Sequence, residues 1–159
     1  MSASQPIFEE QAPLCAADVV RGVTRLFYRQ NLMVLAEVPL GNGRRADMVA
    51  IDASGFVTLV EIKVSVADLR GDRKWPEYLG YCDRFFWALP AGFDHELVAE
   101  PGFQPERTGL IVADRFDAAV LREPAFAPLN ASRRKAALLR FARCAALRNM
   151  AALDPALRL

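Results

Sequence analysis

Residues 44–64 decide the fold, and they read RRADMVAIDASGFVTLVEIKV. Two apolar runs flank Ala53-Ser54-Gly55, a stretch of small residues that is typical of a tight turn. This pattern predicts a β-hairpin with one strand on either side of the turn. With a three-residue loop and Gly55 in the left-handed conformation, Asp47 lies directly opposite Glu61.

Charged side chains inside these apolar strands need a reason, because burying an unpaired charge is costly. Strand alternation places Glu61 and Lys63 on one face, where Asp47 joins them across the hairpin. Two facing carboxylates repel unless a cation lies between them, and Mg²⁺ takes oxygen ligands and often uses only one or two carboxylates. We therefore predict a Mg²⁺ (or Mn²⁺) site on Asp47 and Glu61. Lys63 is the third predicted catalytic residue, which the carboxylates keep protonated so that it stabilises charge.

The residues before this hairpin add another candidate ligand. Residues 33–40 have the pattern of a strand, and Gly41-Asn42-Gly43 has that of a second turn. A three-residue loop here brings Glu37 beside Asp47. Glu37 is therefore a candidate third metal ligand.

Beyond this three-stranded antiparallel meander, hydrophobic periodicity predicts further elements. The strands of the meander are 33–40, 44–51 and 56–64, and the further strands are 84–89, 109–113 and 118–122. The predicted helices are 17–30, 65–72, 75–81 and 131–153, with a loop at 91–107. This order predicts a mixed α/β (α+β) fold, in which a central mixed sheet is flanked by helices. The length suits one domain at 17–153, with a flexible arm at 1–16 and a tail at 154–159.

Composition indicates where in the cell the protein is expected and which metal or disulfide sites it can form. The sequence has no long apolar run and no signal-peptide pattern, so we expect a cytoplasmic protein without membrane association. Cys15, Cys82 and Cys144 are widely separated, which fits neither a disulfide framework nor a zinc site. His95 is the single histidine and is predicted to be an ordinary surface residue.

The positive charge is concentrated at the C-terminus. The chain has a net charge of +1, yet residues 131–159 hold seven Lys or Arg and one Asp. On the predicted last helix, one side is basic and the other is apolar. The basic residues are Arg133, Arg140, Arg143 and Arg148, and the apolar ones are Leu138, Ala142, Ala145, Ala146 and Leu153. The basic side is either a phosphate-binding face or simply the solvated side of a helix that packs through its apolar face.

Other candidate nucleic-acid contacts follow the third strand. Arg73 and Lys74 can return to the rim of the site, where Lys74 would contact a phosphate. Trp75 or Tyr78 could stack on a base, although Trp75 suits the core equally well. Arg45 is a weaker candidate, because we expect the pleat to point it away from Asp47. DNA is the expected partner, and a homodimer would double the modest basic surface.

Asp47, followed by a hairpin and Glu61-Ile62-Lys63, resembles the motif of the PD-(D/E)XK nuclease superfamily. Three longer strings resemble the MmcB-like family of bacterial DNA repair proteins: GNGRRAD at 41–47, VEIKVSVAD at 60–68 and DRKWPEYLGYCDRFF at 72–86. The resemblance covers roughly residues 17–150 and implies a restriction endonuclease-like core and a role in DNA repair. DNA cleavage is inferred from the superfamily motif. Ala46 stands where the superfamily motif often has proline. The first predicted helix lacks the glutamate that many relatives supply there, which makes Glu37 its candidate substitute.

Three functions follow from these patterns. The first is a metal-dependent DNA endonuclease in repair, and the second is a non-cleaving DNA-binding module of the same fold. The third is a protein-interaction domain in which Asp47, Glu61 and Lys63 form only a cross-strand salt bridge on a solvated sheet face.

Overall fold

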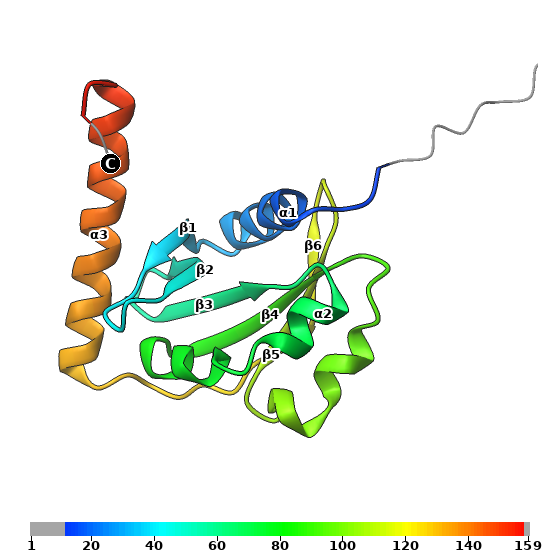
Figure 1. The fold of residues 1–159 in the computed structure, drawn as a ribbon. Helices are drawn as coiled ribbons and strands as arrows, with labels where there is room; N and C mark the ends of the chain where they lie inside the picture. The colour runs from blue at the N-terminus through cyan, green and yellow to red at the C-terminus, as the bar shows by residue number, and fades with distance from the viewer. Residues whose placement is uncertain (1–11, 158–159) are drawn as a thin grey trace, which may run out of the picture.

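The computed structural model describes residues 12–157, so residues 1–11 of the predicted arm and 158–159 of the predicted tail lie outside the described part of the chain. The helices and strands follow the predicted order, and most boundaries agree closely with prediction (Figure 1). They are α1 (Ala16–Arg29), β1 (Met33–Pro39), β2 (Arg45–Ile51), β3 (Val57–Ile62), α2 (Val66–Gly71), β4 (Arg84–Pro90), β5 (Gly109–Ala113), β6 (Ala118–Arg122) and α3 (Ala131–Leu153).

Two segments differ from prediction in type. Residues Trp75–Tyr81 form a 3₁₀ helix, η1, where an α-helix was expected. The predicted loop at 91–107 contains two more 3₁₀ helices, η2 (His95–Ala99) and η3 (Pro101–Phe103). Such short helices lack the long periodic pattern by which a sequence reveals an α-helix.

Within the described residues, six strands form one sheet in the order β1-β2-β3-β4-β5-β6. β1, β2 and β3 make the predicted antiparallel meander, β3 to β5 run parallel, and β6 is antiparallel to β5. Parallel pairing needs a crossover connection, and α2 with η1 provides it between β3 and β4. The predicted mixed sheet flanked by helices is confirmed.

The two faces of the sheet bury different cores. α1 covers one face with Val19, Val23, Leu26 and Phe27, and a capping box between Cys15 and Asp18 starts this helix. The other face carries an aromatic cluster with ring centroids 5.0 to 5.6 Å apart. Its members are Trp75, Phe85, Trp87 and Phe103. Trp75 is only 3% exposed and is therefore a core residue, which excludes the predicted stacking on a base.

Both hairpin turns have the predicted geometry. Gly55 has a φ of 84°, and its N–H donates to the carbonyl of Asp52 at 3.0 Å. The resulting ladder runs from Ile51 opposite Val57 to Met48 opposite Val60. Gly43 likewise has a φ of 80°, a conformation that favours glycine because it has no Cβ. The turns therefore set the register of the whole meander.

The ladder between β1 and β2 is interrupted at Glu37 and Asp47. Ala36 pairs with Met48 and Val38 with Ala46, while Glu37 itself has a φ of 52°. Val38 and Ala46 contribute to the aromatic face, although Met48, two residues beyond Ala46, lies on the α1 face. Strict alternation would keep positions 46 and 48 on one face. The pleat is therefore broken at the residue that carries the predicted site.

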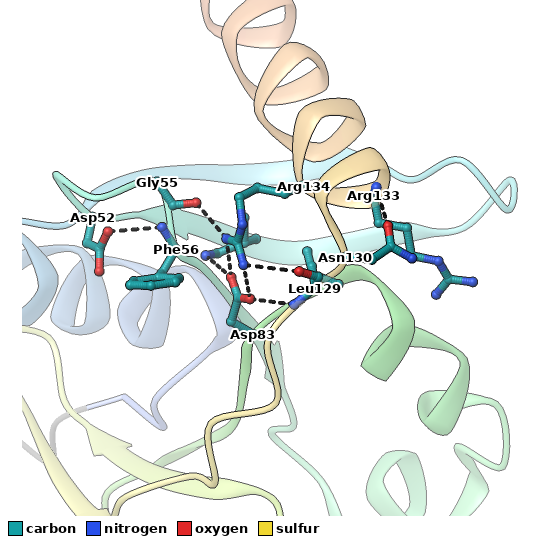
Figure 2. A network of polar contacts seen from close by, with 9 residues as sticks. Asp52, Gly55, Phe56, Asp83, Leu129, Asn130, Arg133 and Arg134 are labelled. Atoms are coloured by element: carbon teal, nitrogen blue, oxygen red, sulfur yellow. Dashed lines mark hydrogen bonds and ion pairs between the residues drawn. The ribbon is translucent and has the colours of Figure 1, made fainter.

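A buried ion pair fixes the start of α3 to the sheet (Figure 2). Asp83, whose side chain is 0% exposed, accepts two hydrogen bonds from Arg134 at 2.6 and 2.8 Å and two more from the backbone N–H groups of Val57 and Leu129. Burial opposes ionisation, but these donors outweigh it and lower the pKa of Asp83. Arg134 also donates to the carbonyl of Gly55 at 3.0 Å. One guanidinium thus joins α3 to the β2–β3 turn and to Asp83.

α3 rises along one end of the sheet and extends beyond it (Figure 1). The predicted division of its faces is partly wrong. Phe141 is buried at 8% exposure and Leu138 is half-buried, but Ala142, Ala146 and Leu153 are exposed. The face that packs is centred on Phe141 and includes arginines, which bond to backbone carbonyls of the sheet and its loops.

Candidate active site

β2 and β3 separate at Asp47 and Glu61, and the two side chains bridge the gap. The backbone N–H of Asp47 donates to Glu61 Oε1 at 3.2 Å, and the N–H of Ile62 donates to Asp47 Oδ2 at 2.8 Å. Each carboxyl group is thus anchored to the opposite strand through one oxygen, which leaves a second oxygen on each to bind a cation. The predicted juxtaposition of Asp47 and Glu61 is confirmed.

These carboxyl groups lie in a poorly solvated place. Glu61 is 3% exposed and Asp47 is half-buried. Burial raises the pKa of Asp47, and burial together with the charge of Asp47 raises the pKa of Glu61 to about 8. In the absence of a cation, the pair therefore retains a proton at neutral pH. A salt bridge on a solvated face, the alternative interpretation of these residues, does not match this burial.

Lys63 lies in the same site, and two acidic residues hold it there. Its side chain is 8% exposed, and Nζ donates to Asp72 Oδ2 at 2.8 Å and lies 3.8 Å from Asp68 Oδ1. Burial alone would lower the pKa of Lys63, but the hydrogen bond to Asp72 and the charges of Asp72, Asp68 and Glu61 raise it. The prediction that neighbouring carboxylates keep Lys63 protonated is confirmed in direction.

Asp68 and Asp72 are not among the site residues predicted from the sequence. Both belong to the short crossover after β3, where Ser65 caps α2 by accepting a hydrogen bond from the N–H of Asp68. Asp72 is the C-terminal cap of the same helix. The available signal was a capping serine two residues after Lys63, since it predicts a helix that turns back over the site.

A pocket of about 630 Å³ contains all of these groups. Its wall includes Ala16, Ala17 and Val20 of α1. The charged lining residues are Glu37, Asp47, Glu61, Asp68 and Asp72, against Arg45 and Lys63. The excess of acidic groups disfavours a phosphate in the pocket unless a cation is bound as well.

Glu37 lines the pocket but does not join the carboxylate pair. Its side chain is 66% exposed, and Oε1 lies 3.4 Å from Arg45 Nη2. Within residues 12–157, no three His, Cys, Asp or Glu side chains are gathered into a metal cluster. Asp47 and Glu61 alone still suit Mg²⁺ or Mn²⁺, which can complete its shell with water and substrate oxygens.

Arg45 corrects one prediction, because it lines the pocket and does not point away from it. The break in the pleat at Asp47 accounts for the difference. Tyr78 also lines the pocket, but its ring is 9% exposed and its hydroxyl donates to the carbonyl of Arg45 at 3.3 Å. Burial, followed by the charges of Glu61 and Asp72, raises the pKa of Tyr78 to about 12. Tyr78 therefore supports β2 and is not available to stack on a base.

Arg73 and Lys74 are exposed and directly follow Asp72, which lines the pocket. The backbone N–H of Lys74 donates to Asp72 Oδ1 at 3.2 Å, so the same carboxylate orients both Lys63 and this loop. Neither residue lines the pocket of Asp47, Glu61 and Lys63, and Arg73 lines a neighbouring one with Arg70 and Glu100. Their contact with phosphate stays a prediction.

The arginines of α3 lie elsewhere, and several contact the protein itself. Arg133 donates to the carbonyl of Gly80 at 2.9 Å, and Arg148 donates to that of Glu37 at 2.9 Å. The guanidinium of Arg140 lies 5.9 Å from the centre of the Tyr81 ring, whereas Arg143 is exposed. Arg133, Arg140 and Arg148 therefore do not form the fully solvated stripe that one interpretation of the sequence expected.

His95 and the three cysteines are described next. His95 is about half exposed and lies 3.6 Å from Glu96, and Cys15, Cys82 and Cys144 are free thiols. Among residues 12–157, no helix has the length and apolar character needed to cross a membrane.

The family model for MmcB-like DNA repair proteins matches residues 3–156, which is nearly the whole chain. The chain belongs to the MmcB-like family. This membership places it among DNA repair proteins, as the strings around Asp47, Glu61 and Lys63 predicted.

A solved structure supports the fold of this MmcB-like chain. It is the SPO1766 protein of unknown function from Silicibacter pomeroyi, with 34% sequence identity and a TM-score of 0.81. The match covers 94% of this chain and 97% of the other. No curated protein matches the chain.

Proposed function

We propose that this chain is a metal-dependent DNA nuclease of the PD-(D/E)XK type that acts in DNA repair. The observation that carries the proposal is the pair of strand-anchored carboxyl groups, Asp47 and Glu61, which share an acidic pocket with the buried ammonium group of Lys63. Membership in a DNA repair family supplies the substrate class.

The chain's own residues would contribute positioning and charge. Asp47 and Glu61 would hold Mg²⁺ or Mn²⁺, which lowers the pKa of water and neutralises charge on a phosphodiester when bound. Lys63, held protonated by Asp72, would donate hydrogen bonds to a non-bridging phosphate oxygen as negative charge increases there. Hydrolysis adds water across one P–O bond and leaves a phosphate and a hydroxyl end. Arg45, which lines the pocket, and the exposed Arg73 and Lys74 would contact flanking phosphates.

The acidic excess in the pocket favours a metal-dependent enzyme over a simple DNA-binding module. A pocket that binds a phosphate backbone without a cation would be expected to present mainly basic groups, because phosphate contacts supply most non-specific affinity. Here the acidic lining residues outnumber Arg45 and Lys63.

The test is a cleavage assay on duplex, flap, branched, single-stranded and damaged DNA with Mg²⁺ and with Mn²⁺. We expect metal-dependent cleavage that falls at least about 100-fold in Asp47→Ala and Lys63→Ala. DNA binding by both variants, measured in Ca²⁺, should persist. Glu96→Gln, at a carboxylate 81% exposed and outside the residues that line the pocket, is the matched control and should retain full activity.

Metal binding has an independent readout. Mg²⁺ should raise the melting temperature of the parent protein and leave that of Asp47→Ala unchanged, because a ligand stabilises only the state that binds it. Salt-sensitive DNA binding without cleavage under either metal would contradict the proposal and identify a non-cleaving module. If the protein neither binds nor cleaves DNA, the result would favour a protein-interaction domain.

A further inference from the structure

Large apolar side chains are concentrated on the outer face of α3. Leu139, Leu147, Met150 and Leu153 are 53, 47, 51 and 79% exposed, while Phe141 on the opposite side is buried. Single exposed apolar residues are normal on protein surfaces, but a contiguous group marks an interaction site. The last turns of α3 extend past the sheet (Figure 1), and all four side chains are exposed.

The spacing of these side chains matches a helix-docking surface. Leu139, Ala146 and Leu153 recur every seven residues, and Met150 lies four residues after Ala146. A repeat of this kind aligns side chains in one stripe that a second helix can pack against. Beside the stripe, Leu147 and Met150 form a groove with Pro39 of β1, with a volume of about 660 Å³.

The charge around the stripe has a single sign. Residues 131–153 contain six Lys or Arg and no Asp or Glu. Arg143 is exposed within the stripe, and Arg140 and Arg143 both line the groove. Any occupant must therefore cover apolar side chains and meet the positive charges of Arg140 and Arg143.

We propose that the outer face of α3 binds an acidic amphipathic helix of a partner protein. Apolar residues of such a helix would cover Leu139, Met150 and Leu153, and its flanking carboxylates would pair with Arg140 and Arg143. A second copy of α3 would bring like charges together, which disfavours self-association through this face. Nucleic acid would meet the arginines but leave the leucine and methionine side chains uncovered.

The test uses a labelled synthetic peptide of about three heptads, with leucine at the stripe positions and glutamate on the flanks. We expect the full-length protein to bind it, as measured by fluorescence anisotropy. The double variant Leu139→Asp/Met150→Asp should bind at least about tenfold more weakly. Leu121→Asp alters a side chain of similar exposure on β6 and should bind like the parent.

Controls separate the proposed occupant from others. A peptide of the same composition with its leucines scattered should bind at least about tenfold more weakly, and equal binding would overturn the proposal. Unaltered melting temperatures would show that the variants fold, as expected for exposed positions. Displacement of the peptide by short duplex DNA, stronger binding to phosphatidylglycerol vesicles than to the peptide, or dimerisation lost in the double variant would each overturn it in favour of that occupant.

Discussion

The β2–β3 hairpin and α3 each carry several charged side chains, but these side chains have different surroundings in the folded protein. The hairpin directs Asp47, which is half-buried, and Glu61, which is buried, into a pocket that they share with the buried Lys63. α3 directs several of its arginines onto the protein and presents leucine and methionine side chains to solvent. In a strand, turn length and alternation decide which face is buried. In a terminal helix, tertiary contacts decide it.

The largest expected effect on stability tests how α3 is fixed to the hairpin. Arg134→Ala leaves the buried carboxylate of Asp83 without its ion-pair partner, so we expect the free energy of unfolding to fall by about 3 kcal/mol. Urea denaturation measures the change. Arg133→Ala, one residue away, removes a single exposed hydrogen bond and should cost less than about 0.5 kcal/mol. Equal losses for the two variants would show that the ion pair is not what fixes the helix.

A second prediction concerns the proton held by the carboxyl pair. The pKa of Glu61 is raised from an ordinary value near 4.5 to about 8. The folded state therefore binds a proton that the unfolded chain releases, and the free energy of unfolding of the metal-free protein should fall as pH rises from 4.5 to 8. Glu61→Gln removes this loss and should be on the order of 2 kcal/mol more stable than the parent at pH 8. A parent and variant with parallel pH profiles would contradict this account.

A third prediction tests the role of Asp72. This residue is a positioning residue, because it would act on the reaction only through Lys63. Asp72→Asn removes the charge that opposes the effect of burial on Lys63, so the pKa of Lys63 should fall. If cleavage occurs as proposed, activity should fall about tenfold and its alkaline limit should move to lower pH. Asp68→Asn, at 3.8 Å and largely exposed, should change the profile less. An unchanged pH profile in Asp72→Asn would exclude this role.

The smallest expected effect lies on α3. Leu139→Ser and Leu153→Ser should each change the free energy of unfolding by less than about 0.5 kcal/mol, because both side chains are already in solvent. Phe141→Ala should cost about 3 kcal/mol, because that ring is buried. A large loss at Leu139 would mean that this face is packed, and the contrast with the hairpin would then disappear.

Sequence reasoning succeeded where local rules decide structure. Alternation and two glycine-containing turns were enough to place Asp47 opposite Glu61 and to predict the meander. Asp68, Asp72 and the orientation of Arg45 were missed, because they depend on a tertiary crossover and on a break in the pleat. On α3, the sequence shows helical periodicity but not which side faces the sheet. Arginines with long apolar stems were able to take packing positions there.

The three-residue turn at 53–55 has a consequence for how this protein can change. If a one-residue insertion here shifted the pairing of β3 instead of lengthening the loop, every side chain of β3 would move to the opposite face of the sheet, and Val60 would replace Glu61 in the pocket. No substitution of an acidic residue would be needed to destroy the site. The register that this turn sets therefore matters to the site as much as the identity of the carboxylates does, although Ala53 and Ser54 are themselves exposed.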